Sequence, residues 1–318
     1  MGSILSRFLL EHDDTVRVVA VGRNPERTAS LAVHTGVADR KYEYHRLHVV
    51  SDVQRLVDLL WDVMPEVIVN VAAQGEEAAS WSHSWRYFET NTVAIARIVE
   101  SLLASPWRGR WVQIGSASVY GSGQIASTEE SPLRAATPYA ASKAAADLYL
   151  LAVHAMKQFS ATIVRPPSLY GPGQQTYRVI PRTILCALQG TRLPLHGGGE
   201  AKKFYLHASD LCRAIYSVAQ RGADGRIYNV GPEAGGTIRD VVEMIAQKVG
   251  VPFDRLVDLA PARGKQDTQA SLDSSRIRSE LGWEPKVGLS EGLDEMINWM
   301  KPRLELLRLE PVEFRLQV

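Results

Sequence analysis

Short, almost continuously apolar runs alternate with segments of helical periodicity through the first half of this sequence. The apolar runs occupy residues 15–21, 66–73, 110–116 and 161–166. Strands that are apolar at nearly every position need cover on both faces, so we expect a parallel sheet between two layers of helices. The intervening segments carry apolar residues at spacings of three and four, which predicts helices. The alternation predicts an α/β fold with a Rossmann-like, doubly wound parallel sheet.

The alternation weakens after residue 166. Gly- and Pro-rich stretches ("YGPGQQ", "LPLHGGGE" and "VGPEAGG") there separate shorter apolar segments. We therefore expect two lobes, a dinucleotide-binding Rossmann lobe over residues 1–166 and a smaller α/β substrate lobe over residues 167–318. Some segments of the second part are expected to return to the first lobe.

The first residues, "MGSILSRFLL", allow two interpretations. The pattern M-G-x-x-x-S is the short signal for N-myristoylation, which would place the protein on a membrane. Alternatively, Gly2 begins the helix that follows a phosphate-binding loop, because a strand-like segment comes next. We favour the second interpretation, in which the first strand and the start of the Gly-rich loop are missing. It implies either a natural start further upstream or a degraded paralogue.

Composition argues against several classes of function. The 36 Lys and Arg residues nearly balance the 35 Asp and Glu residues, so there is no basic surplus for nucleic acid. The two cysteines and eight histidines show no metal-ligand spacing, and we expect no metal. No run approaches the ~18 apolar residues of a membrane span, and the start does not resemble a signal peptide. We expect a cytoplasmic protein without membrane partners.

Tyr139 and Lys143 stand four residues apart in "TPYAASKAAAD" and would share one face of a helix. A phenol has a pKa near ~10 and needs a nearby cation to act as a base at neutral pH. Lys143 could supply that cation, although the spacing alone also fits a core Tyr and a solvated Lys. Ser116 ends an apolar run, at the sheet edge where doubly wound folds bind ligands. We predict Ser116, Tyr139 and Lys143 as the catalytic residues.

Several segments resemble the motifs of extended short-chain dehydrogenases/reductases of the nucleotide-sugar epimerase/dehydratase type. Besides the Tyr139/Lys143 pair, they are "PEVIVNVAAQ", "YFETNTVA", "GSASVYG", "VRPPSLYGPGQ", "KFYLHASDLCRAI" and "LDSSRIRSELGWEP". The resemblance covers nearly the whole chain and is highly specific when the motifs are taken together. Within this family the chain looks closest to members described as dTDP-glucose 4,6-dehydratase-like.

The resemblance implies an enzyme that oxidises the 4-hydroxyl of a nucleotide sugar with NAD or NADP. Tyr139 would take the hydroxyl proton, assisted by Ser116 and Lys143, while the nicotinamide accepts hydride. The resemblance also implies a homodimer, formed through the helix of Tyr139 and the long helix before it. It assigns cofactor binding to Gly2, Arg23, Ala72, Ala73, Asn91, Tyr139, Lys143 and Pro166, and substrate binding to Gln74, Ser118, Ser168, Lys203 and Arg263.

One departure from the family bears on the reaction. Its dehydratases follow the catalytic hydroxyl with Asp-Glu, whereas this chain has Ala117 and Ser118, which cannot exchange protons near neutral pH. We therefore favour 4-epimerisation or a related 4-keto conversion. The alternatives are a 4,6-dehydratase with a substitute acid/base and a non-catalytic dinucleotide-binding protein. Glu76 and Glu77 are candidate substitutes, but base rates for charged loop residues favour a solvated pair.

A second departure concerns the cofactor. The segment "VGRNPER" lacks the acidic residue that binds the ribose 2′-hydroxyl of NAD in Rossmann folds. Gly22 stands at that place, and Arg23 or Arg27 could pair with the 2′-phosphate of NADP. The choice between NAD and NADP stays open on these residues.

Overall fold

The computed structural model describes residues 1–25, 41–123, 126–262 and 271–314. Arg27 and Arg263, named above as candidate ligands, lie outside the described residues. The elements up to residue 166 are α1 (Gly2–His12), β1 (Val18–Gly22), β2 (Tyr42–Arg46), α2 (Val53–Val63), β3 (Val67–Asn70), η1 (Ala78–Trp81), α3 (Ser84–Phe88), η2 (Glu89–Val93), α4 (Ala94–Ala104), β4 (Arg110–Ile114), η3 (Ala117–Tyr120), α5 (Pro138–Lys157) and β5 (Ala161–Arg165). The later elements are β6 (Ser168–Tyr170), α6 (Val179–Gln189), β7 (Leu193–His196), η4 (Gly197–Gly199), β8 (Lys202–Lys203), β9 (Tyr205–His207), α7 (Ala208–Arg221), β10 (Ile227–Asn229), β11 (Gly236–Thr237), α8 (Ile238–Val249), α9 (Phe253–Leu256), β12 (Val257–Ala260), α10 (Ser275–Leu281), α11 (Leu289–Met300), η5 (Lys301–Arg303) and α12 (Leu304–Leu307).

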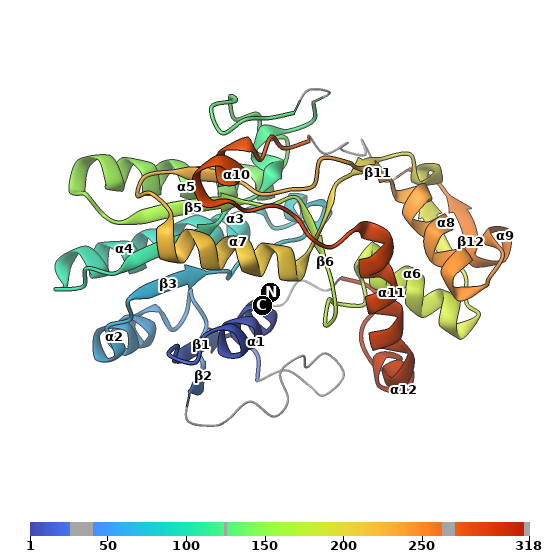
Figure 1. Ribbon diagram of the computed structural model, residues 1–318, viewed down its shortest axis with the longest axis horizontal. Coiled ribbons are helices and arrows are strands. Elements are labelled where there is room, and N and C mark those ends of the chain that lie inside the picture. The colour runs from blue at the N-terminus through green and yellow to red at the C-terminus, as the bar shows by residue number, and fades with distance from the viewer. Residues whose placement is uncertain (26–40, 124–125, 263–270, 315–318) are drawn as a thin grey trace.

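The first lobe is built on parallel strands, as the apolar runs predict (Figure 1). One sheet has the order β10-β5-β4-β3, and all its neighbours are parallel. β1 and β2 form a second, separate parallel pair. The two sheets are separate, since β1 and β3 are not paired with each other. The predicted α/β architecture with a doubly wound sheet is therefore confirmed, in two pieces.

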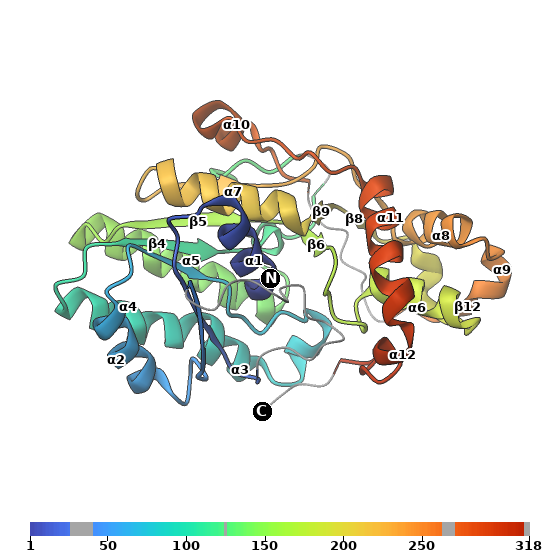
Figure 2. The same ribbon diagram turned by 60° about the horizontal axis from the view of Figure 1, so that its bottom comes forward.

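Helices cover both faces of the larger sheet, with α7 on one side of β4 and β5 and α4 on the other (Figure 2). On the α7 side, Leu5 and Phe8 of α1 join Ile215 in a cluster of buried residues. On the α4 side, Ile98 packs in a cluster with Leu150 of α5. Burial of large apolar side chains of this kind contributes roughly 1.5–3 kcal/mol each. This two-sided burial explains why the strands read as continuously apolar.

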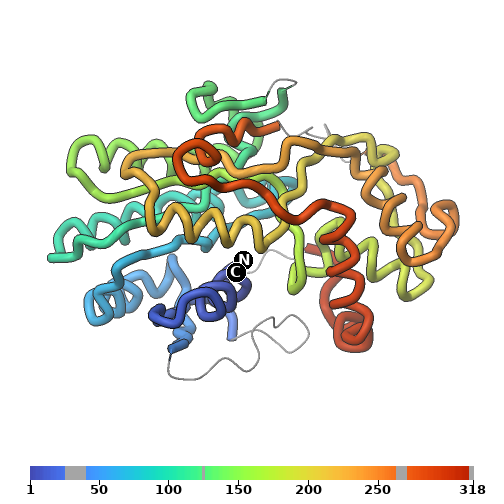
Figure 3. Tube along the Cα trace, in the orientation of Figure 1, coloured from blue at the N-terminus to red at the C-terminus, as the bar shows by residue number. Residues whose placement is uncertain are grey.

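The second lobe is mainly helical and lies beside the first (Figure 3). Ile184 of α6, Ile245 of α8 and Leu293 of α11 share one buried cluster. β7 pairs in parallel with β12, and β8 pairs antiparallel with β11. Chain from beyond residue 166 also returns to the first lobe, since β10 extends the larger sheet at its β5 edge.

His207 ends β9 and is almost fully buried. Its Nδ1 is hydrogen-bonded to the Ser209 hydroxyl, and its ring lies edge-on to Tyr170 with centroids 5.1 Å apart. Glu295 lies 3.5 Å from Nε2. Burial is the main reason that the pKa of His207 falls from 6.5 to about 4, with a smaller effect of the Arg213 charge.

The lowered pKa predicts a loss of stability in mild acid. Between pH 6.5 and about 4 the unfolded chain binds a proton at His207 that the folded chain does not, so the free energy of unfolding falls as the pH falls. The loss should reach about 3 kcal/mol at the lower end of the window. Urea unfolding across the window should show a flatter pH dependence for His207→Asn than for the parent chain. Equal slopes for the two proteins would refute the assignment.

Candidate active site

The position of Tyr139 follows from the start of α5. Thr137 caps this helix, because its hydroxyl accepts a hydrogen bond from Ala140 N at 3.1 Å, and Pro138 occupies the first turn. Tyr139 therefore lies at the beginning of a helix whose next turn carries Lys143. The ring of Tyr87 lies edge-on to that of Tyr139, with centroids 6.4 Å apart. The cap of the helix and the packing of the Tyr87 ring together hold Tyr139 at the beginning of α5.

Ser116 reaches the phenol from the carboxyl end of β4. It caps η3, and its Oγ accepts a hydrogen bond from Ser118 N at 3.2 Å. The Ser116 hydroxyl also lies close enough to the Tyr139 side chain to favour the phenolate and so to oppose the rise of its pKa. The predicted Ser116/Tyr139 pair is thus brought together in the structure.

Lys143 is buried at the base of the same site. Its Nζ donates a hydrogen bond to the carbonyl of Ile114, the last residue of β4. One turn further along α5, Asp147 forms a fully buried ion pair with Arg165, whose Nε lies 2.8 Å from Oδ2. Burial lowers the pKa of Lys143 to about 8, and the Asp147 charge opposes this shift. The lysine therefore helps to tie α5 to β4.

The electrostatics of Tyr139 differ from the sequence expectation. Burial raises its pKa to about 12, the Ser116 hydrogen bond and the Arg178 charge act in the opposite direction, and Glu77 and Asp147 add to the rise. Lys143 was expected to lower this pKa, but its ammonium group is directed at the Ile114 carbonyl. Within the described residues, the groups that lower the pKa of the phenol are therefore Ser116 and Arg178.

The loop after β3 places two carboxylates at the site. Asn91 fixes its start, because Oδ1 accepts from Gln74 N at 2.9 Å and Nδ2 donates to Gln74 O at 3.1 Å. Asn91 lies in η2, a π-helical turn of the kind often found at functional sites. Glu76 is paired with Arg178 at 3.1 Å between Oε2 and Nη1. The Ser118 hydroxyl donates a hydrogen bond to Oε1 of Glu77.

The prediction that Glu76 and Glu77 form a solvated pair is therefore wrong. Both side chains are half-buried, and each has a partner from a distant part of the sequence. The sequence analysis names Glu77 as a candidate substitute acid/base but favours a solvated side chain. It does not identify Arg178 as part of the site. Arg178 also donates to the carbonyl of Gly75, at 3.0 Å, across 103 residues of sequence. No local pattern indicates such a contact.

The first turn of α1 fits the diphosphate of a dinucleotide. The N-terminus of a helix carries partial positive charge and N–H groups suited to phosphate. Ser3, in this turn, has a buried hydroxyl with no hydrogen-bond partner. Gly2 lies against the carboxyl end of β3, where an added Cβ would stand 3.6 Å from Val71 Cγ2, and Ala72 and Ala73 follow directly. These residues fit the cofactor role predicted for them.

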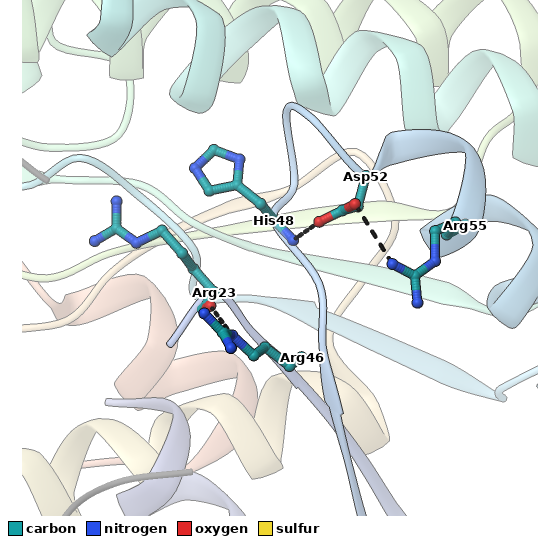
Figure 4. A pocket seen from close by; sticks show the side chains of 5 residues that line it. All are labelled: Arg23, Arg46, His48, Asp52 and Arg55. Carbon is teal, nitrogen blue, oxygen red and sulfur yellow. Dashed lines mark hydrogen bonds and ion pairs between the residues drawn. The ribbon is translucent and has the colours of Figure 1, made fainter. Parts of the chain in front are cut away.

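The remaining predicted ligands fall in two places. Arg23 follows β1 and lines a pocket of about 410 Å³ at the ends of β1 and β2 (Figure 4). Pro166 follows β5, and its carbonyl accepts from Ala117 N at 2.9 Å, next to Ser116. Ser168 is on β6 and Lys203 on β8, strands that lie where the two lobes meet (Figure 2).

Within the described ranges, no helix is both long and apolar enough to cross a membrane. The same part of the chain holds no group of three or more His, Cys, Asp or Glu side chains arranged to bind a metal ion.

The sequence profile of the NAD dependent epimerase/dehydratase family matches residues 1–231. The chain is 35% identical over 248 residues to a dTDP-glucose 4,6-dehydratase of Streptomyces niveus, covering 77% of this chain and 73% of that protein. Its fold is similar to that of a dTDP-glucose 4,6-dehydratase from Bacillus anthracis in complex with NAD, with a TM-score of 0.86, 27% identity, and coverage of 96% and 94% of the two chains. A UDP-glucose 4-epimerase from Thermotoga maritima shares the fold, with a TM-score of 0.85, 21% identity, and coverage of 95% and 96%.

Proposed function

The chain belongs to the NAD-dependent epimerase/dehydratase family, and from this premise we propose that it is a nucleotide-sugar 4,6-dehydratase. The observation that carries the proposal is the hydrogen bond from Ser118 to Glu77, beside Ser116 and Tyr139. This hydrogen bond supports a role for the Glu77 carboxylate beside Ala117 and Ser118, the positions at which the dehydratases of this family carry Asp-Glu. The sequence alone favoured 4-epimerisation because Glu76 and Glu77 were expected to be a solvated pair.

The first step is oxidation of the sugar at C4. Ser116 holds the phenol of Tyr139, which takes the proton of the C4 hydroxyl as general base. Lys143 acts on this step as a positioning residue, since it fastens α5 to β4 through Ile114. The bound nicotinamide supplies a hydride acceptor for C4 and later a hydride donor for C6. Gly2, Ser3, Ala72 and Ala73 are the residues that would hold the cofactor nearest this site.

The second step is loss of water across C5 and C6. Oxidation at C4 makes the hydrogen on C5 acidic, and Glu77 takes it as a proton. The protonated Glu77 then passes that proton to the C6 hydroxyl, whose C–O bond breaks to release water. To complete the reaction, C6 would take back the hydride that a bound nicotinamide supplies, and C5 a proton from solvent, so that the cofactor is restored and the net change is the loss of one water molecule. Gln74, Ser118, Ser168 and Lys203 are proposed to bind the nucleotide sugar around these groups.

A 4-epimerase remains the second candidate, favoured by Ala117 and Ser118 at the positions of the acid pair. The two reactions share the first step and differ in the product. Incubation of the protein with dTDP-, UDP-, GDP- and CDP-hexoses and with NAD or NADP, followed by mass spectrometry and NMR, separates them. A product lighter by one water supports dehydration. Unchanged mass with inverted C4 would establish the epimerase instead, and no conversion of any sugar would refute both.

We also propose a cytoplasmic homodimer that forms through α4 and α5. Val93, just before α4, and Leu148, on α5, are 50% and 56% exposed, more than apolar side chains of a covered helix face usually are. Pairing of these helices with those of a second copy would bury both. Sedimentation of the parent chain and of Leu148→Glu, at the same concentration, tests this proposal. A parent chain that sediments as a monomer would refute it.

A further inference from the structure

The end of β1 has no room for the residue that selects NAD. Rossmann folds that bind NAD carry Asp or Glu there to bond the ribose 2′-hydroxyl. Gly22 occupies the place, and a Cβ added to it would lie 2.4 Å from the Tyr44 hydroxyl oxygen. Tyr44 is held there by a hydrogen bond from its hydroxyl to the Asn24 carbonyl, at 2.5 Å. A carboxylate at position 22 would therefore require Tyr44 to leave its site.

Cationic side chains gather at the same edge instead. The pocket of about 410 Å³ is lined by Arg23, Arg46, His48, Asp52 and Arg55, at the carboxyl ends of β1 and β2 and the start of α2 (Figure 4). Arg46 Nε donates to the Arg23 carbonyl at 3.3 Å, which ties the two strand ends together. Of the described residues that line the pocket, one is a carboxylate, Asp52, and three are arginines. These lining residues together carry a net positive charge.

His48 and Asp52 also line the pocket. His48 adds a hydrogen-bond donor, and the negative charge of Asp52 is limited by its existing partners. Asp52 is already engaged, because Oδ2 accepts from His48 N at 2.8 Å and Oδ1 lies 3.6 Å from Arg55 Nη1. His48 Nδ1 lies 3.2 Å from Val50 N and 3.3 Å from Ser51 N and accepts from both. A neutral His48 with this acceptor carries its proton on Nε2. In Figure 4 its ring lies between Arg23 and Asp52.

We propose that this pocket binds the 2′-phosphate of the adenosine ribose, so that the chain uses NADP in preference to NAD. Arg23 and Arg46 supply the charge-assisted hydrogen bonds, and His48 Nε2 adds a further donor. The proposal is independent of the reaction at the sugar, because it concerns only the adenosine end of the dinucleotide. It also sets the chain apart from the Bacillus anthracis relative, whose crystal structure contains NAD.

Calorimetric titration of the full chain with NADP⁺, NAD⁺, 2′,5′-ADP and ADP tests the proposal without any substrate. NADP⁺ should bind about 10- to 100-fold more tightly than NAD⁺, and 2′,5′-ADP more tightly than ADP by a similar factor. Arg46→Gln and Arg23→Gln should each reduce that preference about 10-fold, because each weakens the binding of NADP⁺ more than that of NAD⁺. Equal or tighter binding of the ligands without the 2′-phosphate would overturn the proposal.

A matched control removes a cation near the same strands but outside the pocket. Arg17 precedes β1 and is paired with Glu43, with Nη2 and Oε2 2.8 Å apart. Arg17→Gln should leave the preference for the 2′-phosphate unchanged. If it lowers the preference as much as Arg46→Gln does, the effect is one of overall charge and the pocket is not the site. Circular dichroism of each variant confirms that a lost preference is not lost fold.

Discussion

Tyr139→Phe is expected to lower turnover of the nucleotide sugar by about 10³-fold or more. The substitution removes only the phenol oxygen, whose pKa the nearby Ser116 hydroxyl lowers and which is the proposed acceptor of the C4 hydroxyl proton. The ring that packs edge-on against Tyr87 is retained. Cofactor affinity and thermal stability should therefore stay close to those of the parent chain. Initial rates of product formation, together with calorimetric cofactor binding, measure both parts of the expectation.

The same helix offers a matched control. Tyr149, on α5, donates a hydrogen bond from its hydroxyl to the Ala96 carbonyl at 3.3 Å. Tyr149→Phe removes a phenol oxygen outside the site and should leave turnover within about 2-fold of the parent value. If Tyr139→Phe retained a comparable rate, the proton would have another acceptor, and the assignment of Tyr139 would fail.

Glu77→Gln is expected to separate the two steps of the reaction. The amide is nearly isosteric and can still accept a hydrogen bond from Ser118, but it cannot take the C5 proton. Loss of water should slow by about 10²- to 10⁴-fold, whereas oxidation at C4 should persist. A single-turnover experiment reads the two steps separately, through the absorbance of reduced nicotinamide and through the mass of the sugar.

Glu76→Gln is the control for loss of one carboxylate from the loop. Glu76 faces Arg178, at 3.1 Å, so its substitution should loosen the loop and raise KM without separating oxidation from dehydration.

Dehydration that proceeds normally in Glu77→Gln would remove Glu77 from the mechanism and leave the C4 oxidation untouched. Loss of oxidation in that variant would instead show that Glu77 supports the Tyr139 step.

The positions of the proposed catalytic pair are predictable from the sequence because their geometry is local. Four-residue spacing on a helix and the end of an apolar strand place Tyr139 and Ser116 by rules that need no tertiary contact. The role of Lys143 is less predictable. Its spacing indicates that it faces the phenol, but in the folded chain the nearest strong acceptor is the Ile114 carbonyl. A buried ammonium group bonds to such an acceptor because desolvation otherwise penalises its charge.

Glu77 and Gly22 show why the rest of the site could not be predicted. A pair of glutamates in a loop is solvated in most proteins, and only the distant Ser118 and Arg178 show that these two are not. At Gly22 the sequence shows only that the acidic residue is absent, whereas the fold places Tyr44 of the neighbouring strand where a side chain at position 22 would begin. In both cases the deciding contact joins residues that no local pattern connects.

The most direct test of dehydration through Tyr139 and Glu77 is the reaction of the parent chain in D₂O. Product isolated from a nucleotide-linked hexose, and examined by NMR and mass spectrometry, should have lost one water and carry a single deuterium at C5. That result requires oxidation at C4, removal of the C5 proton and elimination at C6 to occur in one site. A product of unchanged composition, inverted at C4 and without deuterium at C5, would contradict it.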